Sequence, residues 1–181
     1  MSAIIGDGHL FQSFMSSYDP LSDLKIALEK VKSENPDALL MAGDMFDVKK
    51  TPGTFLRHYE GEGLTITVRQ ILRNFGLPIF SIRGNHEKEE VLRGLTQTVE
   101  NFHYKNNEWG ILGNVAIYFM GTHFEGDFYE PEAISGIIRQ ITTTSEIRKR
   151  RKLLLCHETF APLPNCLPMQ VIEDAKKLFA E

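Results

Sequence analysis

Apolar positions along this chain follow two spacings in turn, one typical of strands and the other of helices. Continuous apolar runs predict strands at 3–6, 38–42, 79–82, 115–120 and 153–156. Apolar residues three or four positions apart predict helices at 64–75, 91–102, 134–141 and 171–179. A further helix is expected from Asp19-Pro20, with Asp as cap and Pro at the first helical position, to Asn35-Pro36. This alternation predicts an α/β layered fold.

Four of the predicted strands end directly in polar side chains that are able to bind metal ions. These side chains are Asp7 and His9, Asp44 and Asp47, Asn85 and His86, and finally His157. Open α/β sheets gather ligands at the carboxyl ends of their strands, so we expect these residues to converge although they lie far apart in sequence. A mixture of carboxylate, amide and imidazole suits Mn²⁺, Fe²⁺ or Zn²⁺ better than Ca²⁺. Two such ions are able to clamp the attacking and leaving oxygens of a phosphoryl displacement.

Composition and charge narrow the class of protein. With 181 residues, 42% of them hydrophobic and 24% charged, the chain is expected to form one domain, 1–181, around its own core. No apolar run approaches the roughly 20 residues of a membrane span, and 1–5 lacks the basic start of a signal peptide. The two cysteines favour a reducing compartment, so an intracellular protein, cytoplasmic or nuclear, is expected. The net charge of −4 argues against indiscriminate binding to nucleic acid but leaves room for a local basic track.

The order of the polar segments resembles that of the calcineurin-like metallophosphoesterases. The matching segments are Asp7-Gly8-His9, Gly43-Asp44-Met45-Phe46-Asp47, Gly84-Asn85-His86 and a lone His157 after an apolar strand. Within that superfamily the chain is most similar to the SbcD-type nucleases of DNA double-strand-break repair. This closer similarity rests also on Lys49-Lys50-Thr51-Pro52, Leu77-Pro78-Ile79-Phe80 and Leu153-Leu154-Leu155-Cys156-His157-Glu158.

The resemblance implies a fold, an activity and partners. The expected fold is α/β, a two-sheet β-sandwich core flanked by helices, with the site at strand ends on one edge. The expected activity is a Mn²⁺-dependent DNA exonuclease or endonuclease that acts in DNA repair or recombination, with two divalent ions as cofactors. The expected partners are DNA, an SMC-like ATPase of the SbcC type, and a second copy of the chain in a homodimer.

The resemblance also assigns a role to each polar residue. Asp7 and His9 would bind one ion, Asp44 would bridge the two ions, and Asn85 and His157 would bind the second. His86 would be the catalytic residue that stabilises the developing charge or protonates the leaving oxygen. Asp47 would lie just outside the ligands and orient one of them.

One part of the family pattern is missing from this chain. Relatives carry a Gly-His-x-His segment after the lone histidine, but no histidine follows His157 before Glu181. We therefore expect a domain that is incomplete at its C-terminal end, with a naturally shortened protein as the alternative. Two other functions stay open: a phosphatase or phosphodiesterase for substrates other than nucleic acid, and a catalytically silent binding module.

Several basic, acidic and aromatic residues have more than one interpretation. Lys49, Lys50, Arg57 and His58 follow the second motif and are candidates for phosphate or DNA contacts. The five basic residues at 148–152 are candidates for contact with a phosphate backbone, or else form a solvated helix end before a buried strand. Glu87 is interpreted as a surface or capping carboxylate. Trp109, Phe102, Tyr104 and Tyr118 are able to stack on bases, although core packing is the commoner role.

Overall fold

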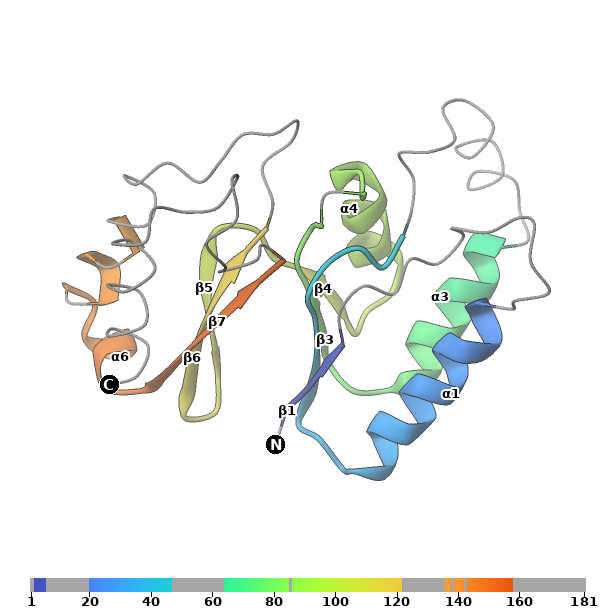
Figure 1. Ribbon diagram of the computed structural model, residues 1–181, viewed down its shortest axis with the longest axis horizontal. Coiled ribbons are helices and arrows are strands. Elements are labelled where there is room, and N and C mark those ends of the chain that lie inside the picture. Colours follow the sequence, from blue (N-terminus) through green and yellow to red (C-terminus); the bar gives the residue numbers. More distant parts are fainter. Residues whose placement is uncertain are drawn as a thin grey trace, which may run out of the picture.

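The computed structural model describes residues 2–5, 20–46, 64–84, 86–121, 136–137, 139–141 and 143–157. Strands and helices alternate up to residue 104 of this part of the chain, and two further strands then follow directly (Figure 1). In chain order they are β1 (Ser2–Ile5), α1 (Pro20–Ser33), β2 (Ala38–Met41), α3 (Leu64–Phe75), β3 (Ile79–Ser81), α4 (Glu89–Thr98), β4 (Phe102–Tyr104), β5 (Glu108–Leu112), β6 (Val115–Met120), α6 (Ser145–Arg148) and β7 (Arg151–Cys156). No helix in these ranges is long and apolar enough to cross a membrane.

The first sheet has four parallel strands in the order β1-β2-β3-β4. Its register places Leu39 beside Ile79, and Ile79 beside Phe102. Every residue of β2 is buried, as expected for a central parallel strand covered on both faces, and this explains its continuous apolar run. Helices α1, α3 and α4 cover the outer face of this sheet, where apolar side chains from helices and strands form one cluster (Figure 1).

The second sheet has three strands in the order β5-β6-β7. Strands β5 and β6 form an antiparallel hairpin, and β7 lies parallel to β6. The two sheets pack together through an apolar cluster of Leu40, Ile82, Ile117, Phe119 and Leu155. The other face of the second sheet is covered by isoleucines, one of which, Ile147, comes from α6. The expected two-sheet core flanked by helices is therefore confirmed.

The structure corrects one helix and adds two strands. The apolar spacing predicted a helix over 91–102, but α4 ends at Thr98 and Phe102 begins β4. The helix stops because Val99 is extended, and the backbone N–H of Phe102 closes the turn by donating to the carbonyl of Val99 at 3.0 Å. The side chain of Asn101 ties this turn to α3 by donating to the carbonyls of Leu72 and Leu77. Strands β4 and β5 were not predicted, because they are short or largely half-exposed. The helix predicted at 171–179 lies outside the described residues.

The aromatic candidates for base stacking are packed into the protein. Phe102 and Tyr118 are buried in two different apolar clusters. Trp109 meets Tyr118 edge to face, with ring centroids 5.2 Å apart, and packs against the same cluster as Tyr118. Tyr104 packs against the cluster that contains Phe102. Core packing is thus the role that the structure supports for these rings.

Candidate metal centre

The site lies where strands of both sheets end. Strands β2 and β3 are parallel neighbours, so the segments that follow them leave the sheet at the same edge. Asp44 follows β2, His86 follows β3, and His157 follows β7 of the other sheet. The three residues come from sequence positions as much as 113 residues apart, and a hydrogen bond and an ion pair bring them together. Asp44, His86 and His157 therefore lie together, as expected of residues that follow the ends of strands.

Asp44 is the centre of this arrangement. It is 2% exposed, and its backbone has a φ of 49°, in the left-handed region that residues other than glycine rarely adopt. Oδ1 accepts a hydrogen bond of 2.8 Å from the backbone N–H of His86, and Oδ2 lies 3.0 Å from Nε2 of His157. Burial raises the pKa of Asp44, but the hydrogen bonds from His157 and His86 outweigh it and hold the pKa below its usual value.

The proton on His157 can be placed by its backbone contact. Nδ1 lies 2.9 Å from the carbonyl oxygen of Ala42, and a carbonyl oxygen only accepts hydrogen bonds, so Nδ1 carries a proton. In a neutral imidazole Nε2 would then present a lone pair to the carboxylate of Asp44. Two acceptors 3.0 Å apart require a positive charge between or on them. That charge is either a second proton on the imidazole or a bound cation.

The residues present fit a divalent metal ion. A histidine that binds metal through one ring nitrogen usually donates its other N–H to a backbone carbonyl or carboxylate, as His157 does to Ala42. Imidazole and carboxylate together suit Mn²⁺, Fe²⁺ or Zn²⁺. Two ligand atoms about 2.1 Å from one ion and at right angles to each other are about 3 Å apart, which agrees with the contact between Asp44 and His157.

Glu87 holds the two loops of the site together. It is 0% exposed, and its carboxylate accepts hydrogen bonds from the backbone N–H groups of Asp44, Phe46 and Gly84 at 3.1, 3.1 and 2.9 Å. Burial raises the pKa of Glu87 to about 7, with the charge of Asp44 acting in the same direction and the backbone N–H groups acting against it. The interpretation of Glu87 as a surface residue is wrong. The capping interpretation is closer, because the carboxylate of Glu87 caps N–H groups of the two loops.

Two glycines allow the loops to approach. Gly43 has a φ of 91°, and a Cβ there would lie 2.7 Å from the backbone nitrogen of Gly84 and 3.1 Å from Nδ1 of His157. A Cβ on Gly84 would lie 2.0 Å from Oδ1 of Asp44. The distances of 2.7 and 2.0 Å are shorter than real Cβ contacts, so neither Gly43 nor Gly84 can be replaced by a larger residue without displacing the site. This explains why glycine precedes the polar residue in both segments.

The structure places only part of the expected set. Asp44, His86 and His157 lie together, with His86 half-buried and joined to Asp44 through its backbone. The others lie outside the described residues: Asp7, His9, Asp47, Asn85, Lys49, Lys50, Arg57 and His58. Within the described ranges no group of three or more His, Cys, Asp or Glu side chains surrounds a common point. The ligand roles, and the catalytic role of His86, stay predictions.

The two-sheet α/β fold, with the buried carboxylate of Asp44 beside the half-buried imidazole of His157 at its strand ends, is consistent with a metal-dependent hydrolase. The family model described as calcineurin-like phosphoesterase matches residues 2–170, and the chain belongs to this family. Proteins of the family are hydrolases that use two divalent metal ions. A search of curated proteins found no match.

Comparison with solved structures finds similarity at low sequence identity. A dimetal phosphatase from Danio rerio is 13% identical, with a TM-score of 0.55, and the alignment covers 98% of this chain and 76% of that one. The nuclease MPE from Pseudomonas putida is 17% identical, with a TM-score of 0.45 and coverage of 65% of this chain. This chain spans 52% of the length of that nuclease.

Proposed function

We propose that the chain is a metal-dependent phosphodiesterase that acts on DNA, a Mn²⁺-dependent nuclease of the SbcD type. The observation that carries the metal-dependent part is the contact of 3.0 Å between Asp44 and His157, whose other ring nitrogen is fixed by Ala42. The preference for DNA rests on the resemblance of the segments at 43–52, 77–86 and 153–158 to that group of nucleases. A role in DNA repair or recombination, a homodimer and an SbcC-type ATPase partner belong to the same proposal.

Each residue of the site has a part in the hydrolysis. Asp7, His9, Asp44, Asn85 and His157 would hold the two ions, and Asp47 would orient one of the ligands. When bound, two divalent ions supply an activated water and offset charge on the phosphoryl oxygens. The P–O bond to the leaving group breaks as the bond to the water oxygen forms, the water releases a proton to solvent, and His86 gives a proton to the leaving oxygen and regains one from solvent. The backbone N–H of His86 donates to Oδ1 of Asp44 and so holds the segment that carries this imidazole at the site.

Calorimetric titration with Mn²⁺ tests the metal site. In Asp44→Asn the amide tolerates the left-handed backbone but lacks the charge of the carboxylate. Loss of a partner that only orients a ligand already lowers metal affinity by about 10–100-fold, so we expect a loss of more than about 100-fold here. Asp23→Asn on α1 is the matched control and should bind as the parent chain does. Equal affinities in the two variants would refute the site.

Hydrolysis assays test the substrate class. Single- and double-stranded DNA should be cleaved in Mn²⁺ in preference to an aryl phosphomonoester, and Asp44→Asn should abolish cleavage. Preference for the monoester would instead assign a phosphatase or phosphodiesterase of non-nucleic-acid substrates. Stoichiometric Mn²⁺ binding with no hydrolysis of any substrate would assign a catalytically silent binding module.

A further inference from the structure

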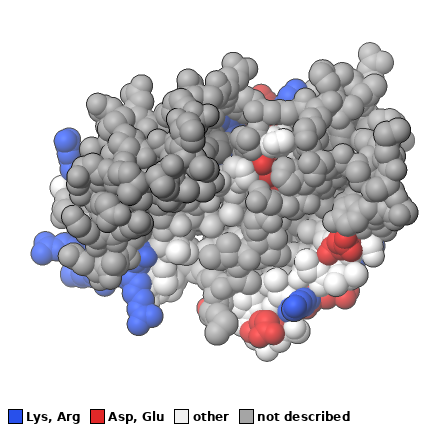
Figure 2. Space-filling model, viewed as in Figure 1, with Lys and Arg blue, Asp and Glu red and all other residues white. Residues whose placement is uncertain are grey.

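The basic segment, residues 148–152, lies at the end of the second sheet remote from the site. Arg148 ends α6, and Arg151 begins β7, which confirms a helix end before a strand. The side chains of Arg148, Lys149 and Arg151 are exposed. Figure 2 shows Lys and Arg side chains gathered on the left flank of the molecule, where Figure 1 places α6 and the start of β7. A solvated helix end accounts for the exposure but not for five consecutive cations.

The local charge sets this segment apart from other basic surfaces of the described chain. No acidic residue lies within 148–152, and the nearest in sequence, Glu146, offers its backbone carbonyl to Nη1 of Arg150 at 3.0 Å. On α1, in contrast, the lysines are interleaved with carboxylates, in the set Asp23, Lys25, Glu29, Lys30 and Lys32. In a chain of net charge −4, an uninterrupted positive segment attracts polyanions locally where the whole molecule does not.

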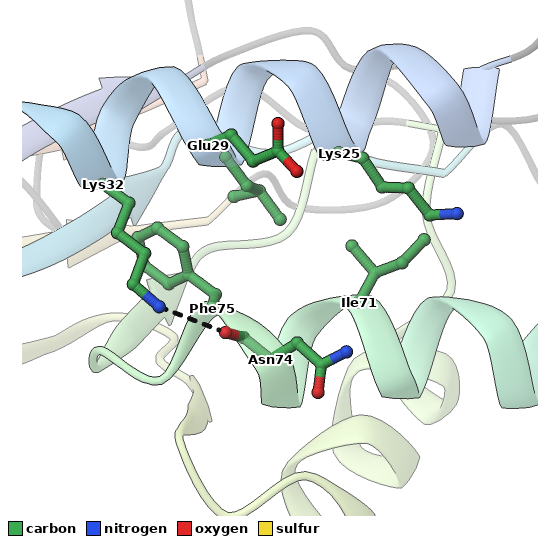
Figure 3. A pocket seen from close by; sticks show the side chains of 7 residues that line it. Lys25, Glu29, Lys32, Ile71, Asn74 and Phe75 are labelled. Carbon is green, nitrogen blue, oxygen red and sulfur yellow. Dashed lines mark hydrogen bonds between the residues drawn. The ribbon is translucent and has the colours of Figure 1, made fainter.

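The groove between α1 and α3 is the alternative basic surface. It has a volume of about 300 Å³, with Lys25 and Lys32 at its edges (Figure 3). Glu29 lies between these lysines, Lys32 donates to the carbonyl of Asn74 at 3.3 Å, and the groove is also lined by apolar side chains such as Phe75. An anion in this groove would meet a carboxylate and an apolar wall, so this surface serves as a control.

Strand β7 sets the distance between the basic segment and the site. It has six residues from Arg151 to Cys156, and His157 follows directly. At about 3.3 Å per residue the segment and the site are about 20 Å apart along the strand. Since each strand of a duplex advances about 3.4 Å per phosphate, this separation corresponds to about six base pairs. Leu155 is buried between the sheets, which holds the strand in place.

We propose that residues 148–152 bind the phosphate backbone of the nucleic-acid substrate about six base pairs from the bond that is hydrolysed. This inference rests on the proposed nuclease function and adds a second contact to it. Arg148 and Arg151 present guanidinium groups that match two phosphate oxygens at once, and Lys149 adds a point charge. The contact is with phosphates, so it lengthens the bound substrate without reading its sequence.

DNA binding in the absence of metal tests the contact apart from catalysis. The triple variant Arg148→Gln/Lys149→Gln/Arg151→Gln is compared with Lys25→Gln/Lys30→Gln/Lys32→Gln, which removes the same charge from α1. Anisotropy of a labelled 20-base-pair duplex is followed in EDTA at several salt concentrations. Each lost phosphate contact lowers the salt slope by about one, so the first variant should lose about three units and the α1 variant none. Equal slopes in both variants and the parent chain would overturn the proposal.

A length series in Mn²⁺ supplies the second test. The ratio of kcat/KM between the parent chain and the first triple variant should rise once the duplex exceeds about six base pairs beyond the cut. A ratio independent of length would overturn the proposal while leaving the nuclease function intact. No cleavage of DNA at any length, with hydrolysis of aryl phosphates retained, would refute the nuclease function itself. Binding to anionic vesicles but not to DNA would also overturn the inference, since it assigns the segment to a membrane surface.

Discussion

Replacing Glu87 separates the role of its hydrogen bonds from the role of its charge. In Glu87→Ala the N–H groups of Asp44, Phe46 and Gly84 lose their acceptor in a buried place. Each buried donor without a partner costs about 1–3 kcal/mol, so the three together cost about 3–9 kcal/mol. Burial raises the pKa of Glu87 from 4.5 to about 7, which means that the charge itself costs about 3 kcal/mol at neutral pH.

The loss of hydrogen bonds and the loss of charge change the free energy of unfolding differently in Glu87→Ala and Glu87→Gln. Removing the charge offsets part of the loss, while removal of one methylene adds about 0.8 kcal/mol to it, so Glu87→Ala should lower the free energy of unfolding by about 1–7 kcal/mol. Glu87→Gln keeps one carbonyl oxygen, which can accept from Asp44 and Gly84, and turns its NH₂ towards Phe46. Losing the hydrogen bond from Phe46 costs about 1–3 kcal/mol, and removing the buried charge offsets this cost. The free energy of unfolding of Glu87→Gln should therefore stay within about 2 kcal/mol of that of the parent chain.

Urea unfolding at pH 7 in EDTA measures both variants, and Glu90→Ala on the same segment is the control. Glu90 is exposed, so its removal should change the free energy of unfolding by less than about 0.5 kcal/mol. Mn²⁺ affinity is measured on the variants that remain folded, and it should fall for Glu87→Ala because Asp44 loses the bond that holds its left-handed backbone. If Glu87→Ala is as stable as Glu90→Ala, or if Ala and Gln are equally destabilising, the assignment of the backbone N–H groups as the main partners of Glu87 is refuted.

Three further predictions concern the same surroundings. Gly84→Ala should fold only with Asp44 displaced, since its Cβ would lie 2.0 Å from Oδ1, and Mn²⁺ calorimetry should therefore show weakened binding. Gly94→Ala is the control, because its Cβ meets nothing within 4 Å, and it should bind Mn²⁺ as the parent chain does. His157→Gln should weaken Mn²⁺ binding, with His103→Gln in β4 as the control, and equal affinities would contradict the role of His157. Burial raises the pKa of Tyr104 to about 12, so the stability it contributes is complete below pH 10 and is lost as the pH rises through 12; alkaline absorbance titration should lose this late-ionising tyrosine in Tyr104→Phe.

The sequence predicts the strands that are buried on both faces better than the others. The runs at 38–42 and 115–120 coincide with β2 and β6, because a strand covered on both sides needs apolar residues at consecutive positions. Strand β5 is only half covered and contains Gly110, so its pattern resembles that of a loop. Strand β4 is three residues long, and its first residue, Phe102, continues the apolar spacing of α4.

The site is predictable in position but not in its contacts. The rule that ligands gather at strand ends correctly brought Asp44 and His157 together. The atoms that meet depend on sheet packing and on a left-handed backbone at Asp44, which no local spacing reveals. Glu87 shows the same limit, since a glutamate in a polar segment gives no sign that it is buried until the two loops are placed around it.

The contact between Asp44 and His157 joins segments that follow strands of different sheets. Asp44 belongs to the four-stranded sheet and His157 to the three-stranded sheet, and the apolar cluster around Phe119 joins the sheets beneath them. A cation that binds both side chains binds only when the sheets are packed, so its binding free energy adds to the free energy of unfolding. The contact between Asp44 and His157 is thus also a polar link between the two sheets, beside the hydrogen bond of His157 to Ala42.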